Sequence, residues 1–243
     1  MRNIEIKVPE LDYSTAEAYK TLRTNLKFSG TDKKVIAVTS CMENEGKSTV
    51  IMNLGIALAE AGEKVVMVDC DLRKSVLLGR TKVGEEVLGL THFLSRQAVL
   101  NDIVNVTNVN NFHMIYAGPT PPNPVELLGS SHFANMITAL KKAYDYVLID
   151  CPPLGMVIDA AVISQQCDGV MLVVESGYDS YRFVRSIQEQ LEKAKCPILG
   201  VVLNKVDMSK GGYYGHYYGK YGKYGKYGSY YGDYGNNNEK EEA

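Results

Sequence analysis

The sequence of 243 residues contains no tryptophan and has only five phenylalanines, five cysteines and four histidines. The cysteines stand far apart with no CxxC pair, and the histidines show no ligand spacing. We therefore expect no zinc site built from histidine and cysteine, and thiols that stay free, as in a reducing cytosol. The formal net charge of −2 gives no reason to expect a nucleic-acid partner.

Long apolar runs are missing as well. No stretch approaches the roughly 18 apolar residues that a membrane-spanning helix needs. The first residues, MRNIEIKVPELDYS, show neither the apolar centre nor the cleavage site of a signal peptide. We expect a cytoplasmic protein that another component must hold if it works at a membrane.

Shorter apolar runs alternate with helical patterns along most of the chain. The runs are continuous rather than alternating, which is typical of strands covered on both faces. This order predicts an α/β fold, with a mostly parallel sheet and helices on both faces. The expected strands are 34–40, 64–69, 112–118, 146–150, 169–174 and 198–204. The expected helices are 14–30, 47–61, 86–95, 130–143, 157–166 and 180–195.

The composition changes abruptly near residue 210. Residues 211–243 contain no branched aliphatic residue to bury, so we expect a disordered tail. At the other end we expect an irregular leader over 1–13, followed by a helix in which Ser14 and Glu17 have capping-box spacing. The predicted organisation is a leader with one helix over 1–30, a core over 31–210 and the tail.

A phosphate-binding loop is predicted where a strand meets a helix, in VIAVTSCMENEGKSTVIMNLG. Its GKST ends the P-loop pattern GxxxxGK[ST], in which backbone N–H groups and the helix dipole bind phosphates. Cys41 replaces the first glycine of that pattern, and Asn44 can adopt glycine-like left-handed geometry. The candidate cofactor-binding residues of this loop are Cys41, Asn44, Glu45, Gly46, Lys47, Ser48 and Thr49.

Two further strands end in acids. KVVMVDCDLRKS places Asp69 and Asp71 just after an apolar run, and YDYVLIDCPPLG places Asp150 at the end of another. The carboxyl ends of parallel strands meet at one edge of a sheet, so we expect these acids beside Lys47. Together with the GKST sequence they indicate a P-loop NTPase-like fold.

These motifs resemble those of the bacterial tyrosine kinases. VVMVDCDLRKS resembles their Walker A′ motif, VLIDCPP their Walker B motif, and SCMENEGKST their phosphate loop. AGPTPPNPVELLGS resembles their proline-rich loop with its following helix, EAYKTLRTN their N-terminal EX2RX2R helix, and the tyrosine-rich end their tail. The matches span nearly the whole chain, and its length is similar to that of the short form found with capsular and exopolysaccharide export.

The resemblance implies ATP and Mg²⁺ as cofactors and gives each residue a role. Lys47 and Thr49 match phosphate-binding positions, and Ser48, Asp71 and Asp150 match the magnesium ligands. Asp69 matches the acid that accepts the tyrosine proton. A phenol has a pKa near 10 and needs such a base at neutral pH. Which of Asp69 and Asp71 takes the proton stays open, so both are candidate catalytic residues with Lys47.

Three more residues have two readings or a lesser role. Arg73 would contact phosphate or orient an acid, or it would form a salt bridge that holds the loop. Asn204, in LNKVD, would contact adenine or would only mark a turn after a strand. Asp159 is expected to cap the helix that begins near it.

The EX2RX2R pattern is here Glu17, Lys20 and Arg23, spaced three apart on one helix face. In the family this face packs between subunits of a ring, so these are the candidate oligomerisation residues. Lysine cannot form arginine's bidentate fork, which weakens the expected contact. The alternative is an ordinary solvated charged face.

The tail is expected to be the substrate. A glycine-spaced segment enters an active site with little steric conflict, and each phosphotyrosine adds a charge of about −1.5 to −2. Condensation and stacking on RNA bases are the alternatives for such a segment. The candidate phosphorylation sites are Tyr213, Tyr214, Tyr217, Tyr218, Tyr221, Tyr224, Tyr227, Tyr230, Tyr231 and Tyr234.

The resemblance also implies partners: a transmembrane activator, or polysaccharide co-polymerase adaptor, that recruits the chain to the inner face of the cell membrane, further copies in a ring, and a phosphotyrosine phosphatase. No nucleic acid is expected. One rival reading is an ATPase switch of the MinD/ParA-like class, in which water attacks the phosphate. Another is a scaffold without enzymatic activity that carries a degenerate nucleotide site.

Overall fold

The computed structural model describes residues 1–77, 79, 81–82 and 87–207. These residues form one sheet with the strand order β4-β1-β5-β6-β3-β7-β2-β8-β9. The strands are β1 (Arg2–Ile6), β2 (Val35–Ser40), β3 (Val65–Asp69), β4 (Thr81–Lys82), β5 (Asn105–Thr107), β6 (Phe112–Ile115), β7 (Tyr146–Asp150), β8 (Gly169–Glu175) and β9 (Ile198–Asn204). The helices are α1 (Tyr13–Phe28), α2 (Lys47–Glu60), α3 (Leu90–Leu94), α4 (Leu100–Ile103), α5 (Pro124–Leu128), α6 (Ser131–Ala143), α7 (Asp159–Ser164) and α8 (Tyr181–Lys193).

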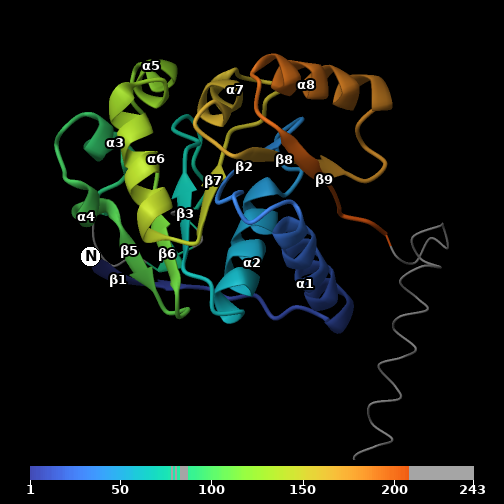
Figure 1. Ribbon diagram of the computed structural model, residues 1–243, viewed down its shortest axis with the longest axis horizontal. Coiled ribbons are helices and arrows are strands. Elements are labelled where there is room, and N and C mark those ends of the chain that lie inside the picture. The colour runs from blue at the N-terminus through green and yellow to red at the C-terminus, as the bar shows by residue number, and fades with distance from the viewer. Residues whose placement is uncertain (78, 80, 83–86, 208–243) are drawn as a thin grey trace, which may run out of the picture.

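The sheet is parallel through its centre, from β6 across to β9. Antiparallel pairing occurs where β5 meets β6 and where β1 meets β4. Figure 1 shows β1 and β9 on opposite sides of the sheet, with α1 lying alongside α2, and the two-residue strand β4 pairs outside β1 as the edge strand. The predicted α/β fold with a mostly parallel sheet is confirmed.

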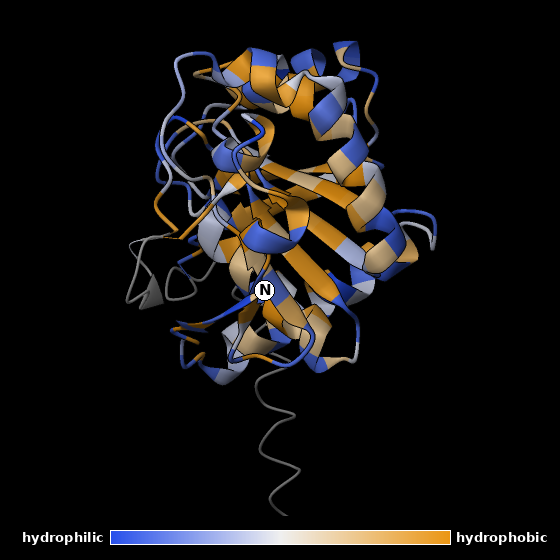
Figure 2. Cartoon of the chain, turned by 90° about the vertical axis from the view of Figure 1, so that its left-hand side faces the viewer, coloured by the Kyte–Doolittle hydropathy of each residue, from blue (hydrophilic) through white to orange (hydrophobic). Residues whose placement is uncertain are grey.

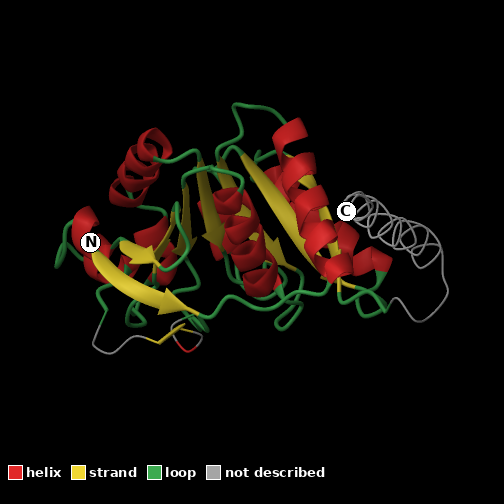
Figure 3. Ribbon diagram, turned by 90° about the horizontal axis from the view of Figure 1, so that it is seen from below, coloured by secondary structure: helices red, strands yellow, loops and turns green. Residues whose placement is uncertain are grey.

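Helices cover both faces of the sheet, so the molecule has two apolar cores. Residues of α1 and α2 pack against one face and residues of α3 to α8 against the other. Successive residues of β2 alternate between them, since Ile36 and Val38 lie in one core and Val35 and Ala37 in the other. Figure 2 shows the hydrophobic colour along the strands, and Figure 3 shows the strands side by side with helices along them. This double burial explains the continuous apolar runs.

The sequence predicted an irregular leader over residues 1–13, and this prediction was wrong for the first residues. Residues 2–6 form β1, which pairs in parallel with β5. Ile4 and Ile6 are buried in the core under α2, while Glu5 between them is exposed. An alternation of this length is too short to predict a strand, and its pairing partner lies about a hundred residues away. Residues 208–243, including the predicted tail, lie outside the described residues.

Other boundaries also differ from the prediction. The strand expected over 112–118 ends at Ile115, and the helix expected over 86–95 begins at Leu90. The capping box was wrong, because α1 begins one residue before Ser14. Asp12 is its N-cap, and the Asp12 Oδ1 atom accepts a hydrogen bond of 3.0 Å from the Thr15 backbone N–H. None of the helices in the described part of the chain is long and apolar enough to cross a membrane.

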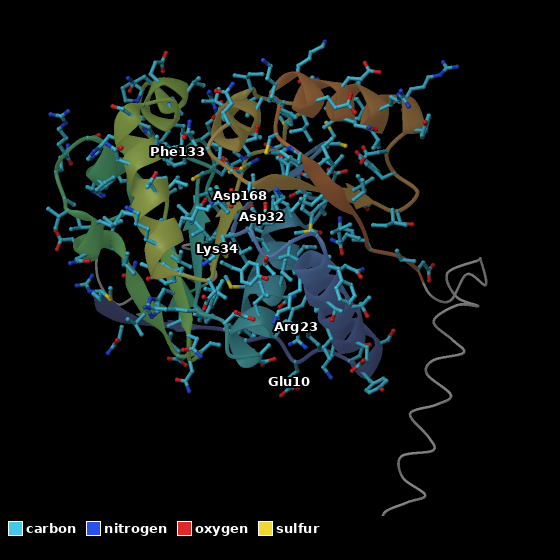
Figure 4. The ribbon with its side chains drawn as sticks, viewed as in Figure 1. Glu10, Arg23, Asp32, Lys34, Phe133 and Asp168 are labelled. Atoms are coloured by element: carbon cyan, nitrogen blue, oxygen red, sulfur yellow. The ribbon has the colours of Figure 1, made fainter. Side chains whose placement is uncertain are left out.

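Arg23 joins α1 to α2. Its Nη1 atom donates a hydrogen bond of 2.7 Å to the carbonyl oxygen of Ala57, and Figure 4 shows Arg23 near the end of α2. Ala57 provides one of the last four carbonyls of α2, which have no partner within a helix. On the same side of α1, Lys20 pairs with Glu17 at 2.7 Å, and the Lys20 side chain is largely exposed while that of Glu17 is partly exposed. Arg23 is therefore engaged by its own chain, whereas Glu17 and Lys20 face solvent.

Close packing of α2 on the sheet depends on Gly55. A Cβ atom at this position would lie 2.6 Å from Phe112 Cε2 and 3.4 Å from Leu148 Cδ1. Alanine is ordinarily better than glycine inside a helix by about 1 kcal/mol. Here the missing side chain lets the helix approach β6 and β7 closely, which places the start of α2 at the edge of the sheet.

Replacing Arg23 by alanine should lower the free energy of unfolding by about 1–2 kcal/mol, because a charge-assisted bond to an otherwise unpaired carbonyl is lost. Lys20→Ala, on the exposed part of the same helix, should change it by less than about 0.5 kcal/mol. Urea unfolding of both variants measures the difference. Equal effects of the two substitutions would contradict the assignment.

Gly55→Ala should destabilise the protein by about 1 kcal/mol, since the cost of overpacking exceeds the gain in helix propensity. Gly200→Ala in β9 is the matched control, because a Cβ atom there meets no atom within 4 Å. The control should be neutral or slightly stabilising. Urea unfolding decides the sign, and a more stable Gly55→Ala variant would refute the packing argument.

Candidate active site

The phosphate loop joins β2 to α2 in a conformation that few residues adopt. Asn44 and Gly46 have φ values of 65° and 88°, and Gly46 is the N-cap of α2. A side chain at Gly46 would collide with the amide of Asn204. That amide donates a hydrogen bond of 2.8 Å to the carbonyl oxygen of Glu45. The loop therefore leads into the start of α2, and a helix start suits an anion because its first N–H groups find few partners within the helix.

Strand register brings the acids together. Asp69 and Asp150 are directly opposed residues of the neighbouring strands β3 and β7. The Nζ atom of Lys47 lies 3.4 Å from Asp150 Oδ1 and 3.6 Å from Asp71 Oδ2. Lys47 Nζ also lies 3.4 Å from the hydroxyl oxygen of Ser48. Residues from three separate stretches of the chain thus meet at the carboxyl edge of the sheet.

The oxygens around Lys47 suit a magnesium ion. Ser48, Asp71 and Asp150 are buried, and one oxygen of each lies within hydrogen-bonding or ion-pair distance of the ammonium group. These three oxygens therefore converge on a position that favours a cation. Carboxylate and hydroxyl oxygens are the ligands that Mg²⁺ takes beside nucleotide phosphates. The residues present thus fit the magnesium that the motifs imply.

The loop after β3 orients both of its acids. Asp69 Oδ1 accepts a hydrogen bond from the Asp71 N–H at 3.1 Å, and Asp69 Oδ2 accepts one from the Ser75 hydroxyl at 2.5 Å. Asp71 Oδ1 accepts from the Lys74 N–H at 3.0 Å, which leaves Oδ2 on the side of Lys47. Sequence reasoning missed Ser75, because nothing in the motif shows that the chain turns back on Asp69.

The acids differ from free carboxyl groups in their protonation. Burial and the nearby charge of Asp150 raise the pKa of Asp69 to about 7, against the hydrogen bond from Ser75. Burial also raises the pKa of Asp150, although the Lys47 charge opposes this. Burial alone would lower the pKa of Lys47, but Asp150, Asp71 and Asp69 raise it. Asp69 therefore has the pKa of a base poised near neutral pH.

Arg73 and Asp159 form a salt bridge. Arg73 Nε lies 2.8 Å from Asp159 Oδ2, and Arg73 Nη2 lies 3.0 Å from Oδ1. This is the holding contact that was one of the two readings of Arg73. The expected capping role of Asp159 was wrong, because Ile158 is the N-cap of α7 and Asp159 is its first residue. A single sequence does not show that an acid at this position pairs with a residue far along the chain.

Glu45 supports the phosphate loop from inside. Its carboxylate accepts hydrogen bonds from the N–H groups of Met42 at 2.8 Å and Glu175 at 3.4 Å. Burial and Asp179, whose carboxyl lies close by, raise the pKa of Glu45 to about 7. Cys41 lies in the same group, and burial raises the pKa of its thiol to about 12, so it is a poor metal ligand at neutral pH. For Cys41 and Glu45, therefore, the backbone rather than the side chain remains a candidate for contact with phosphate.

The raised pKa of Glu45 predicts a pH-dependent stability. The folded protein holds this proton more tightly than the unfolded chain, whose carboxyl has a pKa near 4.5. The stabilisation is therefore complete below about pH 4.5 and is lost as the pH rises through about 7. Glu45→Gln removes this loss, so its stability relative to wild type should rise by up to about 3 kcal/mol between pH 4.5 and 8. Urea unfolding across this range measures it, and a constant difference would refute the assignment.

Comparison with known proteins gives relatives for most of the chain. A family model described as an AAA domain matches residues 33–198. The tyrosine-protein kinase CpsD of Streptococcus agalactiae is 43% identical over 204 residues, which covers 83% of this chain and 89% of that protein. The solved BceF tyrosine kinase domain aligns with a TM-score of 0.72 at 34% identity, over 79% of this chain and 78% of that one.

The phosphate-loop fold extends to ATPases outside the kinases. The septum site-determining protein MinD from Pyrococcus horikoshii OT3, solved with Mg-ADP, aligns with a TM-score of 0.60 at 29% identity, over 73% of this chain and 72% of that one. The TM-score and the sequence identity of MinD are both lower than those of the BceF kinase domain. The alignment with CpsD takes in 83% of the chain, and so it includes the segments that hold GKST and the two acidic strand ends. The chain therefore belongs to the family of bacterial tyrosine kinases.

Proposed function

We propose that this chain transfers the γ-phosphoryl group of ATP to tyrosines of its own C-terminal segment, between neighbouring copies, and so regulates capsular or exopolysaccharide synthesis and export. The observation that carries the proposal is the convergence of Lys47, Ser48, Asp71 and Asp150 beside the buried Asp69. One cation position and one base at a single sheet edge are what phosphoryl transfer to a phenol needs.

In this proposal the phosphate loop and α2 bind the nucleotide. Backbone N–H groups at the start of α2 contact the phosphates, Lys47 reaches the β- and γ-phosphates, and Ser48, Asp71 and Asp150 would hold Mg²⁺. When bound, MgATP supplies the transferable phosphoryl group and neutralises charge as it moves. We also propose that Asn204, which braces the loop from the end of β9, contacts adenine.

Asp69, at the end of β3, and Asp71, just after it, have different roles in this proposal. Asp71 has one oxygen fixed by the loop and the other beside Lys47, which suits a metal ligand. Asp69 has a pKa raised to about 7, which suits the acceptor of the tyrosine proton. The proton moves from the phenol oxygen to Asp69 as that oxygen attacks the γ-phosphorus, the bond from phosphorus to the bridging oxygen breaks, and ADP leaves. The geometry favours this division over the reverse assignment, in which Asp71 would be the base.

The C-terminal segment begins at the same edge of the sheet as the candidate site. The last described residue, Asp207, follows β9 just after Asn204, at the carboxyl end of the sheet. The ten candidate tyrosines lie outside the described residues. The proposal requires residues 208–243 to reach the site of the same or a neighbouring copy, and the r.m.s. span expected of an unstructured chain of 36 residues is roughly 30 Å.

The partners remain part of the proposal. A ring of copies would use the exposed Glu17 and Lys20 of α1, whereas Arg23 contacts its own chain. A transmembrane activator would recruit the cytoplasmic chain to the inner face of the membrane, and a phosphatase would reset it. The proposal rests on family membership for these partners, and on the geometry for the chemistry.

Full-length protein given γ-labelled ATP and Mg²⁺, with and without a candidate activator, should acquire label on tyrosines of 211–243. Lys47→Met should reduce the label at least 100-fold, because the phosphate contact and the charge beside Asp150 are lost. Lys142→Met, an exposed lysine on α6, is the control and should keep wild-type labelling. Mass spectrometry locates the phosphates and circular dichroism checks folding.

The same experiment separates the rival function. An ATPase switch of the MinD type would release free phosphate without labelling tyrosine, and Lys47→Met would stop that release. Tyrosine label that persists in the folded Lys47→Met variant, in a host without other tyrosine kinases, would refute the assigned site.

A further inference from the structure

A buried carboxylate holds the loop that carries the acids. Asp159 is fully buried, and both of its oxygens accept from the guanidinium of Arg73, at 2.8 and 3.0 Å. The Arg73 side chain is 41% exposed, so its guanidinium group reaches the buried Asp159 carboxylate from the surface of the molecule. A bidentate fork fixes orientation as well as distance, which a single ion pair does not.

This fork connects the two acidic strand ends of the site. Arg73 stands two residues after Asp71, in the loop whose N–H and hydroxyl groups hold Asp69 and Asp71. Asp159 is the first residue of α7, the helix that follows the strand ending in Asp150. The salt bridge therefore links the chain after β3 to the chain after β7, beyond the point where the strands themselves are paired.

We propose that Asp159 is a positioning residue for phosphoryl transfer. Through Arg73 it sets the place of Asp71 relative to Asp150, and so the spacing of the carboxylates that would hold Mg²⁺. This inference rests on the proposed magnesium site, whose residues fit the ion. Partners that orient metal ligands commonly change metal affinity or activity by about 10–100-fold when they are lost.

Asp159→Asn in the full chain tests the proposal, because it keeps the size of the side chain but removes the charge and one acceptor. We expect the Mg²⁺ concentration for half-maximal binding of a fluorescent ADP analogue to rise about 10-fold or more. The kcat for tyrosine phosphorylation should fall about 10–100-fold, while KM for ATP at saturating Mg²⁺ changes less than 3-fold. Without nucleotide, amide hydrogen exchange should speed up at Asp71 and Lys74, whose N–H groups bond within the loop.

Asp168→Asn is the matched control. Asp168 also accepts several bonds, from the Lys141 ammonium and from the N–H groups of Lys34 and Val35, but it precedes β8 at the opposite end of the strands. Figure 4 shows it close to Lys34. Its loss should reduce stability while the Mg²⁺ requirement stays at the wild-type value. A purely structural role of Asp159 would give the same result as this control.

A double variant tests whether Asp159 acts through Arg73. If it does, Arg73→Ala and Asp159→Asn should together lower kcat no further than the more damaging single change. If the two losses multiply, Asp159 acts independently of Arg73, which overturns the proposal. If Asp159→Asn does not fold, the same measurements are made on Arg73→Lys, since lysine keeps the charge but cannot form the bidentate fork.

The Mg²⁺ titration and the hydrogen exchange do not depend on the proposed tail phosphorylation, whereas kcat does. A wild-type Mg²⁺ requirement and kcat in folded Asp159→Asn, or in Arg73→Lys where that variant replaces it, would overturn the positioning role. Release of free phosphate without phosphotyrosine by the wild-type chain would refute the tail as substrate. The Mg²⁺ titration and the hydrogen exchange would still test Asp159 in that case.

Discussion

The contact of the Lys47 ammonium group with two carboxylates, Asp150 at the end of β7 and Asp71 in the loop after β3, is the interaction on which the site depends. A buried charge is costly unless it is paired, and Asp150 and Asp71 make the burial of Lys47 possible. The same pairing keeps acids at a sheet edge where burial alone would neutralise them. Phosphate and metal binding use these groups again, so stability and chemistry share one cluster of charges.

The backbone around this cluster is held by contacts from distant parts of the chain. Asn204 at the end of β9 and Glu45 inside the loop brace the phosphate loop, while Ser75 and the Asp159–Arg73 fork brace the loop after β3. The Asn204 and Asp159–Arg73 contacts each join segments at the ends of two different parallel strands, whereas the Ser75 contact and the Glu45 bond to Met42 each hold a single loop. The carboxyl edge is therefore one network, in which the acids keep their spacing because their loops are tied to neighbours.

The helix that matches the family's subunit-contact motif also contributes to this support. Arg23 bonds to the end of α2, and α2 begins at the phosphate loop. Gly55 lets the same helix lie close to the sheet. Any contact on α1 would thus act on a helix that is bonded to α2, which begins at the phosphate loop of the candidate site.

Much of this protein follows from local patterns in its sequence. Continuous apolar runs determined the central strands, because residues buried on both faces must be apolar, and strand-end acids beside GKST determined where the site lies. Short elements such as β1 could not be predicted, since their stability comes from pairing with a strand about a hundred residues away. The partners of Arg73, Arg23, Glu45 and Asp69 were decided only by tertiary structure. The physical reason is that a side chain's type shows what it is able to bind, whereas the folded chain alone decides which group lies within reach.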